Sequence, residues 1–378
     1  MSEGNNDRSS GPPSPNGSYT LVEMLSQPLC WRNVLDDLEQ RNTLRTLGQE
    51  FANVKEWMFI GCGSSYYVAQ SAAATLTALT GKRAQALAAS ELLLFPELVL
   101  AGRENFLPVL ISRSGRTSEV LRAAELLRAR GIATLGIGCA PGQALEKLVS
   151  KAIVIPAADE QSTVMTRSFS SMLLTLQALA ATVAGQPDFV DAQRTGVAKA
   201  AETLLATLPQ RTSKFVSEQD FEDYVALGQG PLYGVACETA LKLTEMSVSY
   251  AQSFHTLEFR HGPKSIVSER TLLVFLLSES GYAAELEVLE EVKGLGGVTL
   301  VIANRAEERA RKAADLLVEL DADAPEVARL PLYVLAGQLM GLYTGLESGL
   351  DPDNPRNLSR VVVLEDEDSP EESTHATV

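Results

Sequence analysis

The chain contains few cysteines and no long apolar run. Its four cysteines, Cys30, Cys62, Cys139 and Cys237, lie far apart and form no Cys-x-x-Cys pair, which argues against a disulfide framework and favours a reducing compartment. No stretch of 18 apolar residues occurs, and the N-terminus has no apolar signal region. We therefore expect a cytoplasmic protein with free thiols and no attachment to a membrane.

Positive charge is also scarce. The 32 lysine and arginine residues are outnumbered by 48 aspartate and glutamate residues, which gives a net charge of −16. This balance argues against binding to the phosphate backbone of nucleic acids. Part of the negative charge lies in residues 365–378, which we expect to form a disordered acidic tail. Residues 1–18 are rich in Ser, Gly, Pro and Asn and are expected to form a disordered leader.

What the chain does contain is a long internal repeat. The pattern Ser-x-Ser-Gly occurs at residues 112–115 and again at 278–281, an offset of 278 − 112 = 166 residues. Gly61 and Gly228 each end an apolar run and differ by 228 − 61 = 167 positions. A repeat of this length is a whole domain. The 378 residues are enough for two domains, each with its own core.

Short apolar runs alternate with longer helical segments in both copies. The expected strands are 56–61, 84–88, 106–112, 132–138 and 152–156 in the first copy, and 222–228, 271–278, 298–303 and 315–319 in the second. The expected helices are 32–48, 65–80, 117–130, 233–249, 282–293 and 326–346, with a helical connection at 168–208. This alternation predicts an α/β fold with parallel sheets between layers of helices. The expected division is an N-terminal helix within 19–49, a first domain at 50–208 and a second domain at 213–364.

Two strand-to-helix loops of the first copy are rich in hydroxyl groups. They follow neighbouring strands, and ligands of parallel sheets bind at the carboxyl ends of the strands. The loop 112–117 offers backbone N–H groups, hydroxyls and a helix N-terminus, which together suit a phosphate dianion. Ser65, in the loop after the expected strand 56–61, would reach the same anion. The alternative is that hydroxyls such as those of Thr117 and Ser118 only cap a helix.

The second copy lacks the corresponding hydroxyls. Thr117 is matched by Ala283, and Ser65 is matched by Leu232. We therefore predict one phosphate site, in the first copy, and interpret the loop 278–281 as vestigial or structural.

The second copy contributes titratable groups instead. Glu238, Lys242 and Glu245 stand at i, i+4 and i+7, on one face of a helix. A surface ladder of ion pairs is the alternative interpretation. His261, one of only three histidines in the chain, precedes a Gly-Pro turn that could present its ring rigidly. Two carboxylates, a lysine and a histidine can transfer protons near neutral pH. His255 is interpreted as structural.

Together these motifs resemble the double SIS (sugar isomerase) domain family, in particular the isomerase half of the glucosamine-6-phosphate synthases. The resemblance covers residues 50–364. The matching segments are 62–66, 112–117, 240–247, 258–263 and 353–358. The resemblance implies two tandem SIS domains, each a flavodoxin-like three-layer αβα unit, without the glutaminase domain of the synthases.

The resemblance also implies how a substrate would be held. The groups implied to bind a sugar 6-phosphate are the hydroxyls of Ser65, Ser112, Ser114 and Thr117 and the amide of Arg113. The further substrate-binding residues are Cys62, Gly63, Ser64 and Arg360. The implied ligand is therefore a small phosphosugar, and neither a metal ion nor an organic cofactor is implied.

The same resemblance implies the chemistry of the second copy. Glu245 would move a proton between C1 and C2 of the sugar through an enediol or enolamine. Lys242 and Glu238 would assist proton transfer at the hydroxyl groups. His261 would open the sugar ring and, in a homodimer, would complete the site of the neighbouring subunit.

The chain departs from the synthase pattern at its start and near its end. About 50 residues precede the first domain, and Ser2 stands where a glutaminase would have its cysteine, so glutamine is not expected to donate nitrogen through this chain alone. Arg360 stands where the synthases have a lysine, and a guanidinium stays protonated and forms no imine. Arg113 and Arg116 replace neutral and acidic residues of the family's phosphate loop. They would strengthen anion binding or recognise a different substituent.

The expected activity is that of an aldose–ketose isomerase or isomerising deaminase on a hexosamine 6-phosphate. Conversion of glucosamine 6-phosphate to fructose 6-phosphate and ammonia is the first candidate. Three alternatives remain: a deglycase of fructosyl-amine 6-phosphates, an ammonia-accepting aminotransferase subunit, and a non-catalytic phosphosugar-binding regulator.

Overall fold

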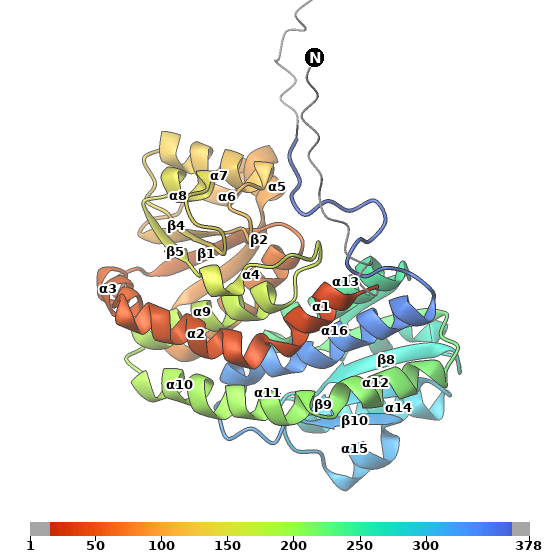
Figure 1. Cartoon of the computed structure of the whole chain (residues 1–378). Coiled ribbons are helices and arrows are strands. Elements are labelled where there is room, and N and C mark those ends of the chain that lie inside the picture. Colours follow the sequence, from red (N-terminus) through yellow and green to blue (C-terminus); the bar gives the residue numbers. More distant parts are fainter. Residues whose placement is uncertain (1–15, 365–378) are drawn as a thin grey trace, which may run out of the picture.

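The computed structural model describes residues 16–364 of the chain (Figure 1). The acidic tail, 365–378, and residues 1–15 of the predicted leader lie outside the described residues. Helix α1 (Ser18–Leu25) begins at the last residue of the predicted leader. The N-terminal part thus contains more helix than the single one expected at 32–48. Helix α2 (Gln27–Gln40) and helix α3 (Thr43–Glu50) are separated at Asn42, which has a left-handed φ of 54°.

Carboxylates from the other end of the chain hold the start of α1. Asp353 accepts hydrogen bonds from the backbone N–H groups of Tyr19 (3.1 Å) and Thr20 (2.8 Å). Asp351 accepts one from the N–H of Gly17 at 3.0 Å. Negative charge is favourable at a helix N-terminus, where the backbone N–H groups lack partners within the helix. Asp353, in the motif at 353–358, therefore joins the two ends of the described chain.

Two five-stranded sheets form the framework, and every strand pair in them is parallel. The first has the order β2-β1-β3-β4-β5, from β1 (Glu56–Gly61), β2 (Arg83–Ala88), β3 (Phe106–Ile111), β4 (Leu135–Gly138) and β5 (Lys151–Val154). The second has the order β10-β9-β8-β6-β7, from β6 (Asp223–Gly228), β7 (Ala251–His255), β8 (Thr271–Leu276), β9 (Val298–Ala303) and β10 (Leu316–Glu319). The predicted α/β fold with two parallel sheets flanked by helices is confirmed. Strand β7 was not predicted, because all five of its residues are half-buried and it shows no apolar run.

Helices cover both faces of each sheet. Those on the first sheet and in the connection are α4 (Ser64–Thr80), α5 (Ala89–Leu94), α6 (Pro96–Leu100), α7 (Ser118–Ala129), α8 (Ala144–Leu148), α9 (Arg167–Val183), α10 (Pro187–Ala192), α11 (Ala198–Leu205) and α12 (Leu208–Ser217). Those of the second copy are α13 (Tyr233–Ser247), α14 (Tyr282–Gly294), α15 (Glu308–Ala313) and α16 (Leu330–Glu347). The largest apolar core contains residues of α4, α9, α13 and α16, while smaller cores lie under α7 and under α14.

Helix α13 is held between α16 and α4 by close backbone contacts. A Cβ atom on Gly341 of α16 would lie 2.7 Å from the carbonyl oxygen of Lys242, and one on Gly345 would lie 2.2 Å from that of Met246. On the other side, a Cβ atom on Gly234 of α13 would lie 2.6 Å from the carbonyl oxygen of Tyr67 in α4. No larger residue fits at these crossings, so the positions of α4 and α13 relative to each other are closely fixed.

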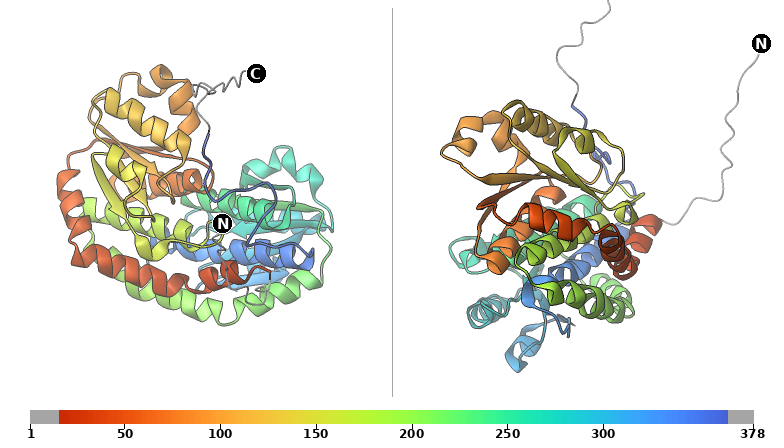
Figure 2. Two further views of the ribbon diagram at one scale, coloured as in Figure 1. Left: turned by 45° about the horizontal axis from the view of Figure 1, so that its top comes forward. Right: turned by 90° about the vertical axis from the view of Figure 1, so that its left-hand side faces the viewer.

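After α16 the chain leaves the second copy and returns to the first (Figure 2). There the N–H of Ser118, the first residue of α7, donates a hydrogen bond to the carbonyl oxygen of Val362 at 3.2 Å. The N–H of Leu364 donates in turn to Oγ of Ser118 at 2.9 Å. The last described residues therefore lie beside the helix that follows the predicted phosphate loop.

Candidate active site

The loop after β1 and helix α13 meet where the two copies face each other. Ser64, at the start of α4, donates a hydrogen bond from Oγ to Oε1 of Glu238 at 3.1 Å. Nζ of Lys242 lies 3.4 Å from the same Oγ. Gly63 makes this turn possible with a φ of 53°, a value that favours glycine. The structure thus brings a residue of the first copy's hydroxyl-rich turn into contact with the titratable helix of the second.

Glu238, Lys242 and Glu245 form a buried triad rather than a ladder on the surface. The side chains of Glu238 and Lys242 are 0% exposed, and that of Glu245 is 17% exposed. Nζ of Lys242 lies 3.3 Å from Oε1 of Glu238 and also pairs with Oε2 of Glu245. Because Glu245 is the only member of the triad that reaches solvent, it is the member that a ligand can approach.

Burial and neighbouring charges set the protonation of Glu238 and Lys242. Burial raises the pKa of Glu238 to about 8, against the opposing effect of the Lys242 charge. Burial lowers the pKa of Lys242, but the two carboxylates raise it by more, so that the net shift is upward. At neutral pH Lys242 is therefore a cation and Glu238 is mostly protonated. Oε2 of Glu238 is buried without a hydrogen-bond partner among the described residues, so no donor there stabilises a negative charge on it.

The loop 112–117 turns its hydroxyls toward one another at the start of α7. Oγ of Ser112 and Oγ1 of Thr117 are 3.0 Å apart. Gly115, with a φ of 63°, donates its N–H to the carbonyl oxygen of Ser112 at 3.1 Å, which closes the turn. Ser114 is half-buried, and its Oγ accepts a hydrogen bond from the N–H of Arg116 at 3.2 Å. Ser65 is 5% exposed in the first turn of α4. The predicted phosphate-binding side chains thus lie near the N-termini of α4 and α7, the helices that follow the adjacent strands β1 and β3.

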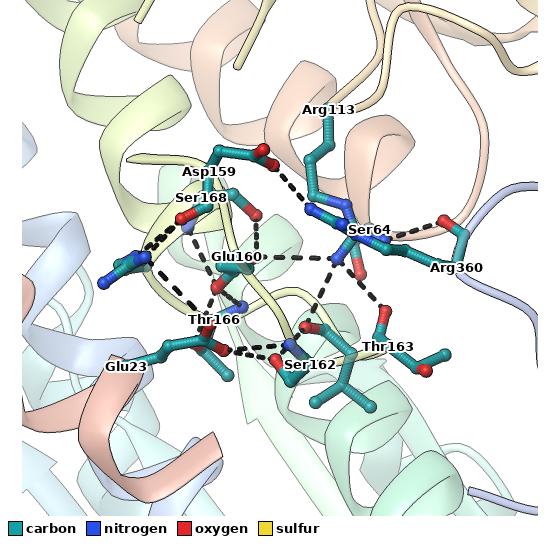
Figure 3. A network of polar contacts seen from close by, with 12 residues as sticks. Glu23, Ser64, Arg113, Asp159, Glu160, Ser162, Thr163, Thr166, Ser168 and Arg360 are labelled. Carbon is teal, nitrogen blue, oxygen red and sulfur yellow. Dashed lines mark hydrogen bonds and ion pairs between the residues drawn. The ribbon is translucent and has the colours of Figure 1, made fainter. Parts of the chain in front are cut away.

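The side chain of Arg113 points away from its loop (Figure 3). It is 5% exposed, and its guanidinium forms an ion pair with Glu160 at 3.5 Å. Nη1 also donates to the carbonyl oxygen of Thr163 at 3.1 Å, and Nη2 donates to that of Arg360 at 2.7 Å. The guanidinium is therefore committed to protein partners, so the expectation that it strengthens anion binding is corrected. The backbone N–H of Arg113 stays the predicted phosphate contact.

The residues around Arg113 form a network that the motifs did not indicate. Oε1 of Glu160 accepts hydrogen bonds from the N–H and Oγ1 of Thr166 at 2.7 and 2.6 Å, and Ser168 also donates to Glu160 (Figure 3). Glu23 of α1 accepts hydrogen bonds from the N–H of Gln161 and from Ser162. Of these residues, Glu160, Gln161, Ser162 and Thr166 lie in the irregular segment before α9, where no periodic pattern marks them.

Two of the predicted substrate-binding residues have other surroundings. The guanidinium of Arg360 forms an ion pair with the carboxylate of Asp159 at 2.7 Å (Figure 3). Cys62 is half-buried, and burial, together with the negative charge of Glu119, raises the pKa of its thiol to about 11. Cys62 is therefore a protonated thiol at neutral pH and not a nucleophile.

The two histidines of the second copy lie apart from the triad. His261 is exposed between two short 3-10 turns, Glu258–Arg260 and Pro263–Ile266, and no contact found within residues 16–364 joins its side chain to the triad. His255 ends β7 and stacks on Tyr233 with ring centroids 3.8 Å apart. The stack agrees with the structural interpretation of His255, whereas His261 is free to meet another molecule.

The loop 278–281 of the second copy is filled by carboxylates of its own domain. Glu285 accepts hydrogen bonds from the N–H and Oγ of Ser278 at 2.7 and 2.8 Å. Glu326 accepts them from the N–H of Glu279 at 2.6 Å and from Oγ of Ser280 at 3.0 Å. The donors of this loop are therefore already bonded to carboxylates of their own domain, which agrees with the prediction of a single phosphate site in the first copy.

A match to a known family places this geometry in context. The sequence model of the SIS domain matches residues 50–182 and 223–343. The chain belongs to the SIS domain family. Its two SIS segments contain all ten strands and the residues of the triad.

Curated relatives of this SIS chain include enzymes described as glutamine–fructose-6-phosphate aminotransferase (isomerizing). The protein from Methanothermobacter thermautotrophicus is 26% identical over 351 residues, covering 92% of this chain and 58% of the relative. The protein from Shewanella oneidensis is 28% identical over 368 residues, covering 92% of this chain and 59% of the relative. The chain thus spans less than two thirds of the length of these relatives.

Solved structures of similar chains cover almost the whole fold. Glucosamine-6-phosphate deaminase from Thermotoga maritima has a TM-score of 0.70 and 28% identity, covering 92% of this chain and all of that one. Tagatose-6-phosphate ketose/aldose isomerase from Escherichia coli has a TM-score of 0.81 and 23% identity, covering 94% of this chain and 99% of that one. The second likeness shows the fold alone.

Two features are absent from residues 16–364. None of their helices has both the length and the apolar character that a membrane crossing needs. Nor does this part of the chain gather three or more His, Cys, Asp or Glu side chains in a way that could hold a metal ion.

Proposed function

We propose that this SIS chain is a phosphosugar isomerase that acts as an isomerising deaminase on a hexosamine 6-phosphate. The first candidate reaction converts glucosamine 6-phosphate and water to fructose 6-phosphate and ammonia. The observation that carries the proposal is the contact of Ser64 with the buried triad, because Ser64 lies next to Ser65 in one of the two loops proposed to hold the phosphate. The relatives and the deaminase of similar structure support the same substrate class.

In the proposed reaction, the phosphate binds to Ser65, Ser112, Ser114, Thr117 and the amide of Arg113. Hydrogen bonds from backbone amides and hydroxyls, together with two helix N-termini, hold the dianion and orient C1 and C2. Binding energy from this remote group is then available for placing the reacting carbons. The open-chain sugar extends from the phosphate toward α13.

The triad of Glu238, Lys242 and Glu245 carries out the proton shift. Glu245, the member that a ligand can approach, removes the proton from C2 of the open-chain aldehyde, and the electron pair forms the C1–C2 double bond of an enolamine. Lys242 and Glu238 lie buried behind Glu245 and assist the proton transfer to O1 from there, Lys242 as a cation and Glu238 as a proton donor. Return of a proton to C1 gives an imine at C2. Water then adds to C2; the proton of the new hydroxyl passes to the amino group, the C2=O bond of the ketone forms, and ammonia leaves with the C2–N bond pair.

Ring opening is assigned to His261 of the partner subunit in a homodimer. Within one chain His261 is exposed and has no contact with the triad among the described residues. A histidine can transfer the ring proton near neutral pH, since its ordinary pKa lies close to 6.5. A dimer that exchanges this residue would make each site depend on both chains.

The test is an ammonia-release assay across a panel of amino-sugar 6-phosphates and fructosyl-amine 6-phosphates. The proposal predicts turnover of glucosamine 6-phosphate and none of unphosphorylated glucosamine. Turnover of the fructosyl-amine 6-phosphates alone would replace it with a deglycase. Binding of fructose 6-phosphate with no chemistry on any member of the panel would identify a regulator instead.

A further inference from the structure

The phosphate loop and the last described residues of the chain are joined by one buried side chain. The backbone of Arg113 belongs to the loop 112–117, but its guanidinium bonds to the carbonyl oxygen of Arg360, 247 positions away in the sequence. The C-terminal segment, defined here as residues 359–364, then continues to Ser118 at the N-terminus of α7. The segment thus contacts the side chain of Arg113 and, at Ser118, the helix that follows the loop.

Glu160 keeps the guanidinium of Arg113 pointing toward the C-terminal segment. Glu160 forms the ion pair with it, and Thr166 and Ser168 donate hydrogen bonds that fix the carboxylate of Glu160. Glu160 is 2% exposed, so neither partner of the pair is stabilised by much water. A planar guanidinium can bond to a carboxylate and to carbonyl oxygens at the same time, and a lysine ammonium cannot reproduce this geometry.

The remaining contacts of the C-terminal segment are more open. Arg360 and Asp159 form an ion pair with side chains 43% and 42% exposed. Exposed ion pairs of this kind contribute little to stability. Val362 and Val363 are 50% and 61% exposed, so apolar burial does not fix the segment either. The partly buried hydrogen bond from Arg113 to the carbonyl oxygen of Arg360 is therefore better protected from competing water than these exposed contacts.

We propose that Arg113 is a positioning residue that fastens the C-terminal segment beside the N-terminus of α7, at the end of the phosphate loop, with Glu160 holding its guanidinium in place. The segment accepts the N–H of Ser118 and borders the helix N-terminus that would face the phosphate. Fastening it there excludes water from this end of the loop and keeps the loop in its bound shape. The expected kinetic effect rests on the proposed function, whereas the position of the segment can be measured without any substrate.

The test is hydrogen–deuterium exchange on the ligand-free full chain, read on peptides that contain Ser118 and Leu364. The main variant is Arg113→Met with Glu160→Gln, which removes both charges and so leaves no unpaired ion in the core. The matched control is Arg360→Ala, which removes the exposed ion pair but keeps the backbone carbonyl that Arg113 binds. We expect exchange at both amides to become about tenfold faster in the double variant and to change less than twofold in the control.

Kinetics on glucosamine 6-phosphate provide the second readout. We expect the double variant to raise KM about tenfold and to change kcat less than threefold, because the triad on α13 is untouched. Wild-type exchange at Ser118 and Leu364 in the double variant would overturn the proposal, whether or not the chain turns over a substrate. A loss of kcat with unchanged KM and exchange would also overturn it. Absence of turnover in the wild type would count against the proposed function alone.

Discussion

The buried carboxyl of Glu238 gives a prediction whose size follows from the structure. Its pKa is raised from an ordinary value of 4.5 to about 8. An acid whose pKa is higher in the folded protein binds its proton more tightly there, so its folded-state advantage is complete below the unfolded pKa of 4.5 and is lost as the pH rises through 8. A shift of 8 − 4.5 = 3.5 units corresponds to about 5 kcal/mol at 1.36 kcal/mol per unit.

The perturbation is Glu238→Gln, which keeps the size of the side chain and removes its titration. The free energy of unfolding of the wild type should fall relative to the variant by about 1.4 kcal/mol per pH unit between pH 5 and pH 8. Above about pH 9 the difference should level off. Urea denaturation followed by circular dichroism from pH 5 to pH 9.5 measures it.

The matched control is Glu290→Gln, which removes a carboxylate on the surface. The Glu290 side chain is 39% exposed, and a hydrogen bond from Arg309 lowers its pKa. Its variant should therefore run parallel to the wild type above pH 5. Parallel curves for Glu238→Gln as well would refute the conclusion that Glu238 is protonated at neutral pH, and with it the proton-donor role.

The remaining predictions concern the two Ser-x-Ser-Gly loops. Ser112→Ala should raise KM for glucosamine 6-phosphate about 10- to 100-fold with little change in kcat, since one hydrogen bond to a charged group is lost. Steady-state kinetics of ammonia release measures this change. An unchanged KM would count against a phosphate at this loop. Glu285→Gln should lower the free energy of unfolding by about 1–3 kcal/mol, because the buried carboxylate accepts two hydrogen bonds from Ser278. Urea denaturation measures this loss. The rate of ammonia release should stay unchanged, and a slower rate would show that the second loop takes part in the reaction.

Much of the fold could be predicted because its signals are local. Strands such as β1 and β8 are continuous apolar runs that end in loops, and their burial leaves few alternatives. Strand β7 lacked that signal, since its residues are all half-buried at the edge of the sheet. The break between α2 and α3 was also missed, because Asn42 adopts a left-handed conformation that no periodic pattern reveals.

For the candidate site, the sequence indicated the residues better than their contacts. The spacing of Glu238, Lys242 and Glu245 predicted a shared face, but whether that face was buried depended on how α13 packs against α4 and α16. The direction of a long side chain is set by tertiary partners, so Arg113 could be assigned to the loop while its link to Glu160 could not. Glu160 itself stands in an irregular segment and has no motif.

The central claim is that Glu245 removes a proton from C2 of a bound hexosamine 6-phosphate. Its most direct test compares ammonia release from glucosamine 6-phosphate by the wild type and by Glu245→Gln at saturating substrate, with Glu290→Gln as the surface control. The account predicts that kcat falls about 10²- to 10⁴-fold in Glu245→Gln, as for loss of a general base, and stays at the wild-type value in the control. A Glu245→Gln protein that releases ammonia at the wild-type rate would contradict it.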